Sequence, residues 1–255
     1  YKNGEPFGII NRTNMQNFGR MGEHKKDTAL GVNPCSEISL NPHESCNLTE
    51  IFLPNLDSAE EFEEAARLMY RWSKRVSCEN YHQPKTDEIV KKNRRLGIGI
   101  TGCLQALNLF EPEALSRGYA AIREEDKIYS KALGVPESIK VTTVKPSGTL
   151  SLLGDVTAGI HPAYSKFYIR RVRFASNDPL IPVLKEAGHK VEPVVKFDGS
   201  FDHNTLVAEF PCRTPDGTPV ADEDWNTWKQ LDVLKMVQKY WSDNSVSVTV
   251  RSEEH

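Results

Sequence analysis

The stretch VTTVKPSGTLS, residues 141–151, begins with β-branched residues and ends in small, hydroxyl-bearing ones. Residues 141–145 predict a strand, because β-branched side chains favour that conformation. Residues 146–149 break the strand at a proline and a glycine, and the run 150–153 that follows is helix-like. A strand that leads through a short turn into a helix is typical of α/β proteins.

The rest of the chain repeats this alternation. Ser58 and Glu61 form a capping box that starts a helix, and Gly134 is expected to end another. The first helix has an apolar stripe expected in the core: Phe62, Ala65, Met69, Trp72 and Val76. Further strands are expected at 96–100, 167–174 and 246–250, and further helices at 123–133, at 178–188 and from Asp222 onward. The alternation predicts an α/β fold with mostly parallel strands.

Composition excludes several classes of protein. The 255 residues carry a net charge of −3, so there is no basic excess to indicate direct nucleic-acid binding. No apolar run is long enough for a membrane span, and no signal peptide is expected. Five cysteines, an odd and sparse set, argue against a secreted disulfide framework, so a cytoplasmic protein is expected. Since the first residue is Tyr1 rather than Met, we expect the chain to be a piece of a longer protein.

The turn after residues 141–145 is a candidate phosphate site. Free backbone N–H groups and the positive end of a helix dipole gather where a strand leads into a helix. Hydroxyl groups in the turn add donors, although Ser and Thr are also common as ordinary helix caps. The spacing of a P-loop is absent. The residues of the candidate site are Pro146, Ser147, Gly148, Thr149, Leu150 and Ser151.

A second candidate site is the segment Asn33-Pro34-Cys35-Ser36-Glu37, followed by Cys46. In an extended segment, alternate residues point the same way, so Asn33, Cys35 and Glu37 would face one pocket. An amide, a thiol and a carboxylate there could orient a substrate, react with it and transfer protons. A turn with an incidental cysteine is the plainer interpretation.

Two other motifs are weaker. Cys35, His43 and Cys46 could bind zinc, but no fourth ligand is evident, and we expect no metal site. Gly97, Gly99 and Gly102 spell G-x-G-x-x-G, but a basic run, not a strand, precedes them. We interpret these glycines as allowing close approach of another backbone or side chain.

Taken together and in chain order, these segments resemble ribonucleotide reductases. Residues 33–37 are similar to the finger-loop signature of that family, and residues 45–48 to the segment after it. Residues 141–149 resemble the substrate-phosphate loop of the adenosylcobalamin-dependent class. Further matching segments lie at 93–97, 158–162, 168–174 and 241–248. The matches run in family order from about residue 30 to residue 250, and they look most like the monomeric triphosphate reductases.

The resemblance implies a fold and an incomplete chain. The family fold is a ten-stranded α/β barrel of two five-stranded halves, with a central finger loop that carries the radical cysteine. The chain would then be a single catalytic fragment, with the finger loop at about 30–50 and the second half-barrel at about 51–255. The upstream half and the C-terminal redox cysteines would be absent, since no cysteine follows Cys212.

The resemblance also implies roles for single residues. Cys35 would be the thiyl radical that takes the 3′ hydrogen of a ribonucleotide, Glu37 the general base, and Asn33 the group that holds the ribose hydroxyls. Cys46 would be one of two reducing thiols, with its partner upstream. Pro34 and Ser36 would contact substrate, as would residues 146–151.

The implied cofactor is adenosylcobalamin, and the implied partners are the missing half-barrel and a thioredoxin-type reductant. Two alternatives stay open on the sequence. One is a hydrolase or transferase that uses Cys35 as a nucleophile with His43. The other is a non-catalytic module that binds zinc or phosphate.

Overall fold

The structure is a computed structural model that describes residues 11–106, 109–221 and 225–250. The chain divides into two compact units. The larger unit takes residues 1–162 and 222–255, and the smaller unit takes Ala163–Ala221. The expected division into a finger loop at about 30–50 and a half-barrel at about 51–255 stays a prediction. The expected start of the last helix, at Asp222, lies outside the described residues.

Parallel strands form the centre of the larger unit. β3 (Leu48–Phe52) pairs in parallel with β4 (Gly97–Thr101), and all five residues of β4 are buried. Single parallel bridges then join Ile98 to Thr142 and Val144 to Val246. The predicted strands at 141–145 and 246–250 are therefore present as extended segments that make isolated bridges. Parallel pairing at the centre agrees with the predicted α/β class.

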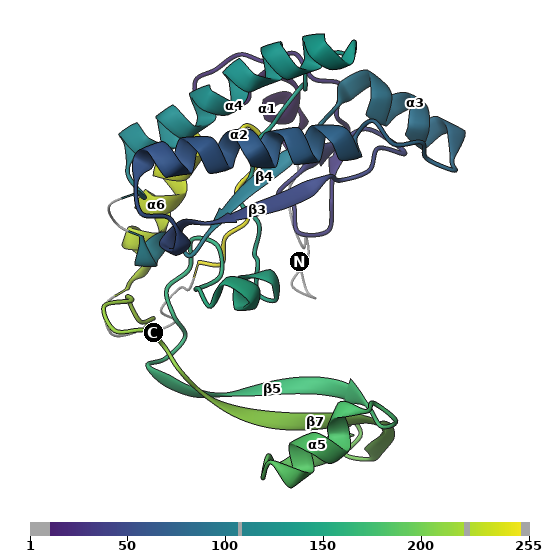
Figure 1. Ribbon diagram of the computed structural model, residues 1–255, viewed down its shortest axis with the longest axis vertical. Coiled ribbons are helices and arrows are strands. Elements are labelled where there is room, and N and C mark those ends of the chain that lie inside the picture. Colours follow the sequence, from purple (N-terminus) through teal and green to yellow (C-terminus); the bar gives the residue numbers. More distant parts are fainter. Residues whose placement is uncertain (1–10, 107–108, 222–224, 251–255) are drawn as a thin grey trace, which may run out of the picture. The chain divides into compact units, whose positions relative to one another are not determined.

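Helices cover this parallel layer (Figure 1). α2 (Ala59–Val76) and α4 (Pro112–Leu133) lie side by side, and α3 (Pro84–Asn93), α6 (Thr227–Tyr240) and the short α1 (Arg12–Asn17) complete the unit. The predicted capping box is confirmed, since Ser58 accepts a hydrogen bond from the N–H of Glu61. Gly134 caps α4 in the left-handed region at φ 67°, as predicted, although α4 begins at Pro112 rather than near residue 123.

The expected core stripe of α2 is partly wrong. Phe62 is fully buried, but Trp72 is 67% exposed and Val76 is also exposed. The buried face carries polar groups instead, because Asp126 of α4 accepts hydrogen bonds from Tyr70 and Lys74. The fully buried residues of this face are Phe62, Ala66, Tyr70, Ser73 and Lys74. A pattern of apolar residues cannot reveal a face that is buried through a polar network.

The smaller unit is an antiparallel sheet with one helix. Its strands are β5 (Phe167–Ala175), β6 (Val191–Val195) and β7 (Phe201–Arg213), in the order β5-β7-β6, and α5 (Leu180–Glu186) follows β5. The strand predicted at 167–174 is confirmed, and the helix predicted at 178–188 is confirmed with shorter bounds. The expectation of mostly parallel strands fails in this unit, because long antiparallel strands pair without crossover helices.

The apolar core lies in the larger unit, between the parallel strands and the helices. Trp241, at the end of α6, is fully buried; its ring lies 5.6 Å from that of Phe62, and its N–H donates to the carbonyl of Thr143 at 2.9 Å. Helix α6 is thereby held against the extended segment that leads to the candidate phosphate turn. None of the helices that the structure describes is both long and apolar enough to span a bilayer.

Candidate functional site

Residues 33–38 form the turn of a short hairpin. β1 (Gly31–Val32) pairs antiparallel with β2 (Ser39–Leu40). The side-chain oxygen of Asn33 accepts from the N–H of Ile38 at 3.1 Å, and Ser36 lies in the left-handed region at φ 63°. The expectation of an extended segment is therefore wrong. Asn33 closes the turn with its own side chain, a local bond that asparagine makes readily.

The turn separates exposed residues from buried ones. Pro34, Cys35 and Ser36 are exposed at its tip, whereas Asn33 and Glu37 are buried at its base. The carbonyl of Glu37 accepts from the hydroxyl of Thr143 at 2.7 Å and from the N–H of Ser245 at 3.1 Å. The buried Oε2 of Glu37 has no hydrogen-bond partner among the described residues. The turn thus carries the free thiol of Cys35 at its tip and the buried carboxyl group of Glu37 at its base, where one carboxyl oxygen accepts no hydrogen bond from the described residues.

Gly97 allows the hairpin to lie against the parallel strands. A Cβ at this position would come within 2.4 Å of the Ile38 side chain and within 2.6 Å of the Leu48 side chain. Gly102, the last glycine of the G-x-G-x-x-G pattern, has φ +69°. These glycines serve close approach and a left-handed turn, in agreement with the interpretation from the sequence.

The candidate phosphate turn differs from its predicted form. The segment after it is a five-residue 3₁₀ helix, Leu150–Gly154, which is too short for a substantial helix dipole. The buried hydroxyl of Ser147 donates to Glu50 rather than pointing outward. The N–H groups of Gly148, Thr149 and Leu150 donate to no protein atom among the described residues. Three adjacent free N–H groups, after Ser147 in the left-handed region at φ 53°, are still donors that an anion could use.

Glu50, in the middle of β3, is a site residue that the sequence analysis missed. It is buried, its Oε1 accepts from Ser147, and its Oε2 lies 3.3 Å from the amino group of Lys145. Burial raises the pKa of Glu50 and the charge of Glu37 raises it further, while Ser147 and Lys145 oppose the rise. Glu50 thus interacts with both candidate sites. The available signal was a lone carboxylate inside an otherwise strand-like run.

The five cysteines differ in exposure, and Cys78 and Cys212 are half-buried. Cys35 and Cys46 are free and exposed, as reactive thiols should be. Cys103 is buried, and burial together with the charge of Glu50 raises the pKa of its thiol, which suits a structural role. His43 is exposed, and no group of three or more His, Cys, Asp or Glu side chains among the described residues could hold a metal ion. The geometry of the described ligands therefore does not support the zinc interpretation.

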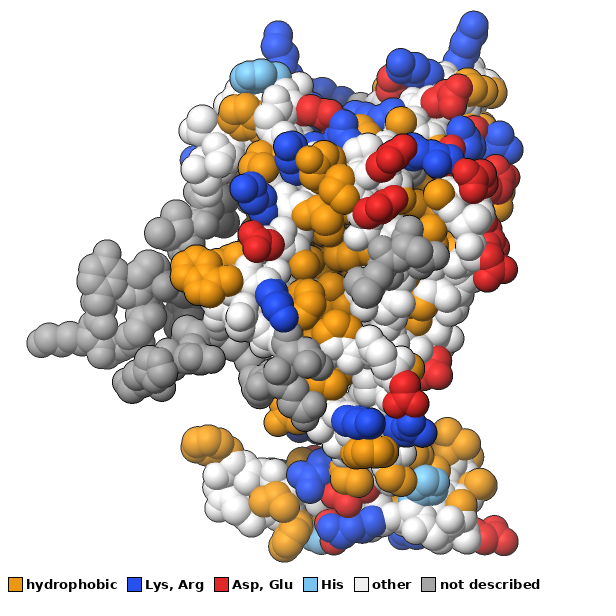
Figure 2. Space-filling view, turned by 90° about the vertical axis from the view of Figure 1, so that its left-hand side faces the viewer, with side chains coloured by type: hydrophobic (Ala, Val, Ile, Leu, Met, Phe, Trp, Pro, Cys, Tyr) orange, Lys and Arg blue, Asp and Glu red, His pale blue; other side chains and the backbone are white. Residues whose placement is uncertain are grey.

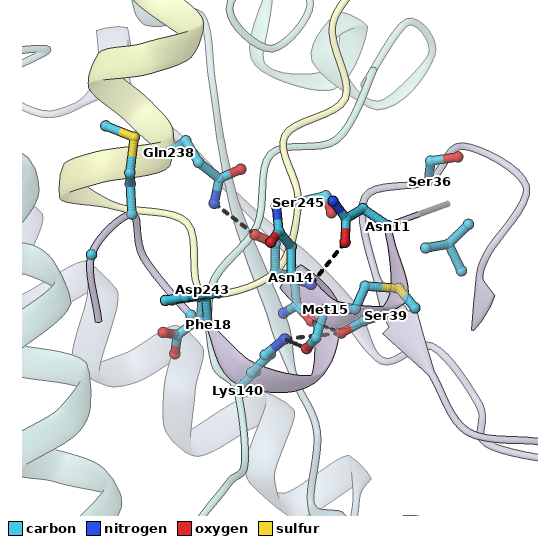
Figure 3. Close-up of a pocket in the computed structure, with 15 residues that line it drawn as sticks. Asn11, Asn14, Met15, Phe18, Ser36, Ser39, Lys140, Gln238, Asp243 and Ser245 are labelled. Atoms are coloured by element: carbon cyan, nitrogen blue, oxygen red, sulfur yellow. Dashed lines mark hydrogen bonds between the residues drawn. The ribbon is translucent and has the colours of Figure 1, made fainter. Parts of the chain in front are cut away.

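A cavity of about 610 Å³ lies beside the hairpin (Figure 3). Of the predicted site residues, it includes only Ser36. Its floor carries the buried Lys140, whose amino group donates to the carbonyl of Met15 and to the hydroxyl of Ser39. Two residues that line the cavity come just before bridged segments of the parallel layer: Lys140 precedes residues 141–144, and Ser245 precedes Val246. The cavity therefore lies at the amino ends of these segments, whereas Pro146–Ser151 follows the carboxyl end of one.

Buried ion pairs hold the base of the hairpin. Arg95 donates two hydrogen bonds of 2.7 Å to Asp27 and one of 3.1 Å to Glu44. Lys140 lies 3.2 Å from Asp27 and also binds Ser39 of β2. All four charged groups are nearly inaccessible to solvent. The hairpin is thus fixed to the strand layer by paired charges, which explains why so many charges are buried near it.

Asp27 should make stability depend on pH. Burial pushes the pKa of Asp27 up, but the hydrogen bonds and charge of Arg95, with the charge of Lys140, outweigh burial and bring it to about 2, below the ordinary 3.8. Because the folded pKa is the lower one, this stabilisation is complete above about pH 4 and is lost as pH falls through about 2. The expected loss is roughly 2 kcal/mol, measured by urea unfolding between pH 5 and pH 2.

Asp27→Asn should remove that part of the acid dependence. The matched control is Asp232→Asn at an exposed position of α6, which should retain it. An Asp27→Asn protein with the same acid dependence as the wild type would contradict the assignment.

Comparison with known proteins gives one consistent family. The model of the ribonucleotide reductase barrel domain matches residues 1–112. A probable adenosylcobalamin-dependent ribonucleoside-triphosphate reductase of Dictyostelium discoideum is 37% identical over 97% of this chain and 33% of its own length. The corresponding enzyme of Lacticaseibacillus paracasei is 35% identical over 98% of this chain and 37% of its own length. The chain thus spans about a third of the length of these relatives.

A solved structure of the same kind of enzyme is also similar to this chain. The crystal structure of a B12-dependent (class II) ribonucleotide reductase superposes with a TM-score of 0.81 at 32% identity, covering 97% of this chain and 39% of that chain. The chain is therefore similar to ribonucleotide reductases over 97% of its own length. Among these enzymes it is similar to the adenosylcobalamin-dependent ribonucleoside-triphosphate reductases.

Proposed function

We propose that this chain carries the catalytic residues of an adenosylcobalamin-dependent ribonucleoside-triphosphate reductase. The observation that carries the proposal is the hairpin turn, in which the exposed thiol of Cys35 lies between the buried side chains of Asn33 and Glu37. The names of the similar enzymes supply the substrate class and the cofactor. In this proposal the hairpin is the finger loop and the parallel layer belongs to the second half of a ten-stranded barrel.

The thiol of Cys35 fits the chemistry that adenosylcobalamin would supply. Cys35 is free and exposed, so a group that removes a hydrogen atom can reach its sulfur. Adenosylcobalamin, when bound, supplies an organic radical able to take that hydrogen atom, and the protein positions the reactants.

Cys35 then acts on the ribose. Its thiyl radical takes the 3′ hydrogen, a reversible step because the S–H bond and the activated C–H bond are similar in strength. Glu37 accepts the 3′-hydroxyl proton, for which its unpaired Oε2 is available. Asn33 uses its side-chain oxygen to bind Ile38, which leaves its amide NH₂ to donate to a ribose hydroxyl.

The remaining groups complete the reaction. Cys46 and a second thiol supply two electrons and two protons, so that the 2′-hydroxyl leaves as water and the two thiols become a disulfide. Cys35 regains its hydrogen when the 3′ hydrogen returns. The N–H groups of Gly148, Thr149 and Leu150 bind the substrate phosphates, with Pro146, Ser147 and Ser151 shaping the turn. Pro34 and Ser36 flank the substrate at the tip of the hairpin.

The proposal implies partners for the chain. A thiyl radical must be shielded from water and from other thiols, and a half-barrel cannot enclose it. Figure 2 shows side chains of the hydrophobic class gathered in the middle of one face of the larger unit, as expected for a surface that another part of a protein covers. We therefore expect the other half-barrel, in the same or another chain, a thioredoxin-type reductant, and a cytoplasmic location.

The test is reconstitution. The reductase that contains this chain, supplied with adenosylcobalamin and a dithiol, should convert a ribonucleoside triphosphate to its 2′-deoxy product. Hydrolysis or group transfer by the thiol without deoxynucleotide would favour the nucleophile alternative instead. A dithiol-independent product would also contradict the proposal.

Cys46→Ser should separate the radical step from the reduction. Because this variant keeps Cys35 but lacks one reducing thiol, steady-state formation of deoxynucleotide should fall to background while Cys35-dependent radical formation persists. Product is measured by chromatography and the radical by electron paramagnetic resonance. Cys78→Ser, a half-buried cysteine whose thiol contacts the carbonyl of Lys74, is the control and should retain activity. Full turnover by Cys46→Ser would exclude the redox role.

A further inference from the structure

Glu50 is a buried carboxylate that is held by specific partners. It lies opposite Gly99 in the parallel pair of β3 and β4, and its side chain is fully buried. A Cβ on Gly99 would be 3.4 Å from Glu50 Oε1, so the glycine leaves room for the carboxyl group. Burying a carboxylate is costly unless it is paired and hydrogen-bonded, so its partners indicate why it is there.

The two partners come from one segment. Oε1 accepts from the hydroxyl of Ser147, and Oε2 lies 3.3 Å from Nζ of Lys145. Ser147 holds a left-handed conformation that is unfavourable for a residue other than glycine, at φ 53°. A conformation of this kind persists only where surrounding contacts determine it, and the bond to Glu50 is such a contact. The next three residues carry the free N–H groups.

We propose that Glu50 is a positioning residue: through Ser147 and Lys145 it holds the turn in the conformation that presents the N–H groups of Gly148, Thr149 and Leu150 to the substrate phosphates. This inference rests on the proposed function and adds to it a residue that does not itself touch substrate.

The kinetic test uses Glu50→Gln and Ser147→Ala in the reductase that contains this chain, with adenosylcobalamin. Each variant should raise the KM for the ribonucleotide by about tenfold, because Glu50→Gln removes the negative charge of the acceptor and Ser147→Ala removes the donor. The kcat should change far less, since phosphate contacts are equal in the ground state and the transition state. The double variant should lose no more than the worse single variant, because both act on one interaction. Glu60→Gln, an exposed carboxylate of α2 paired with Arg117, should leave KM unchanged.

A binding test separates this inference from the proposed function. Inorganic tripolyphosphate should bind the wild-type protein and bind Glu50→Gln about tenfold more weakly, while a ribonucleoside without phosphates should bind both alike. If Glu50→Gln does not fold, the same comparison with Ser147→Ala decides. Unchanged tripolyphosphate binding in a folded variant, no tripolyphosphate binding by the wild type, or fully additive losses would overturn the role of Glu50. If the wild type makes no deoxynucleotide but shows Glu50-dependent tripolyphosphate binding, the proposed function fails and the role of Glu50 stands.

Discussion

Cys35→Ser should abolish deoxynucleotide formation while leaving the fold intact. A serine hydroxyl cannot replace the thiol, because its O–H bond is much stronger and its oxygen radical would not form under the same conditions. A barrier raised by only ~4 kcal/mol would reduce the rate about a thousandfold, so we expect a loss of at least that size. Cys35 is exposed at the tip of a turn, and exposed substitutions usually change stability by less than about 0.5 kcal/mol. Product formation and thermal unfolding, measured on the same preparation, test both statements.

The control for this prediction is Cys212→Ser, which removes a thiol from β7 of the smaller unit. It should keep full activity, because nothing assigns Cys212 to the reaction. Substantial turnover by Cys35→Ser would refute the radical mechanism. Loss of folding in Cys35→Ser would instead show that the turn depends on the thiol for its structure.

Arg95→Met should have the largest effect on stability. It would leave the carboxylates of Asp27 and Glu44 buried, with the charge of Lys140 alone to offset them. Removing one partner of a buried ion pair typically costs about 3–5 kcal/mol, because the remaining charge is neither solvated nor paired. We therefore expect a loss of that size in the free energy of unfolding at pH 7, measured with urea.

Arg117→Met is the matched control for Arg95→Met. Arg117 pairs with Glu60 and Glu63 on the outer surface of α2 and α4, where water can replace the lost contacts. Arg117→Met should lower the free energy of unfolding much less than Arg95→Met does. Equal losses in the two variants would mean that the buried network at the base of the hairpin contributes no more than a surface pair.

The conformation of residues 33–37 differs from the one predicted from the sequence. The sequence placed Asn33, Cys35 and Glu37 on one side of an extended segment, but the structure closes them into a turn. It brings Glu37 into the electrostatic field of Glu50, a residue with no motif of its own. Such a meeting of β3, the hairpin and the phosphate turn depends on contacts between residues far apart in the chain, which local patterns do not encode.

Several local features could be predicted from the residues alone: the cap at Ser58, the left-handed end at Gly134, the extended segment before Pro146 and the order of motifs typical of the family. These follow from short-range sterics and hydrogen bonds within a few residues. The exposure of Trp72, the burial of Lys74 and the hydrogen bond from Ser147 to Glu50 could not be predicted in this way, because they depend on long-range contacts. The reason is physical: burying a polar group is favourable only where a distant partner meets it, and the fold alone brings that partner into place.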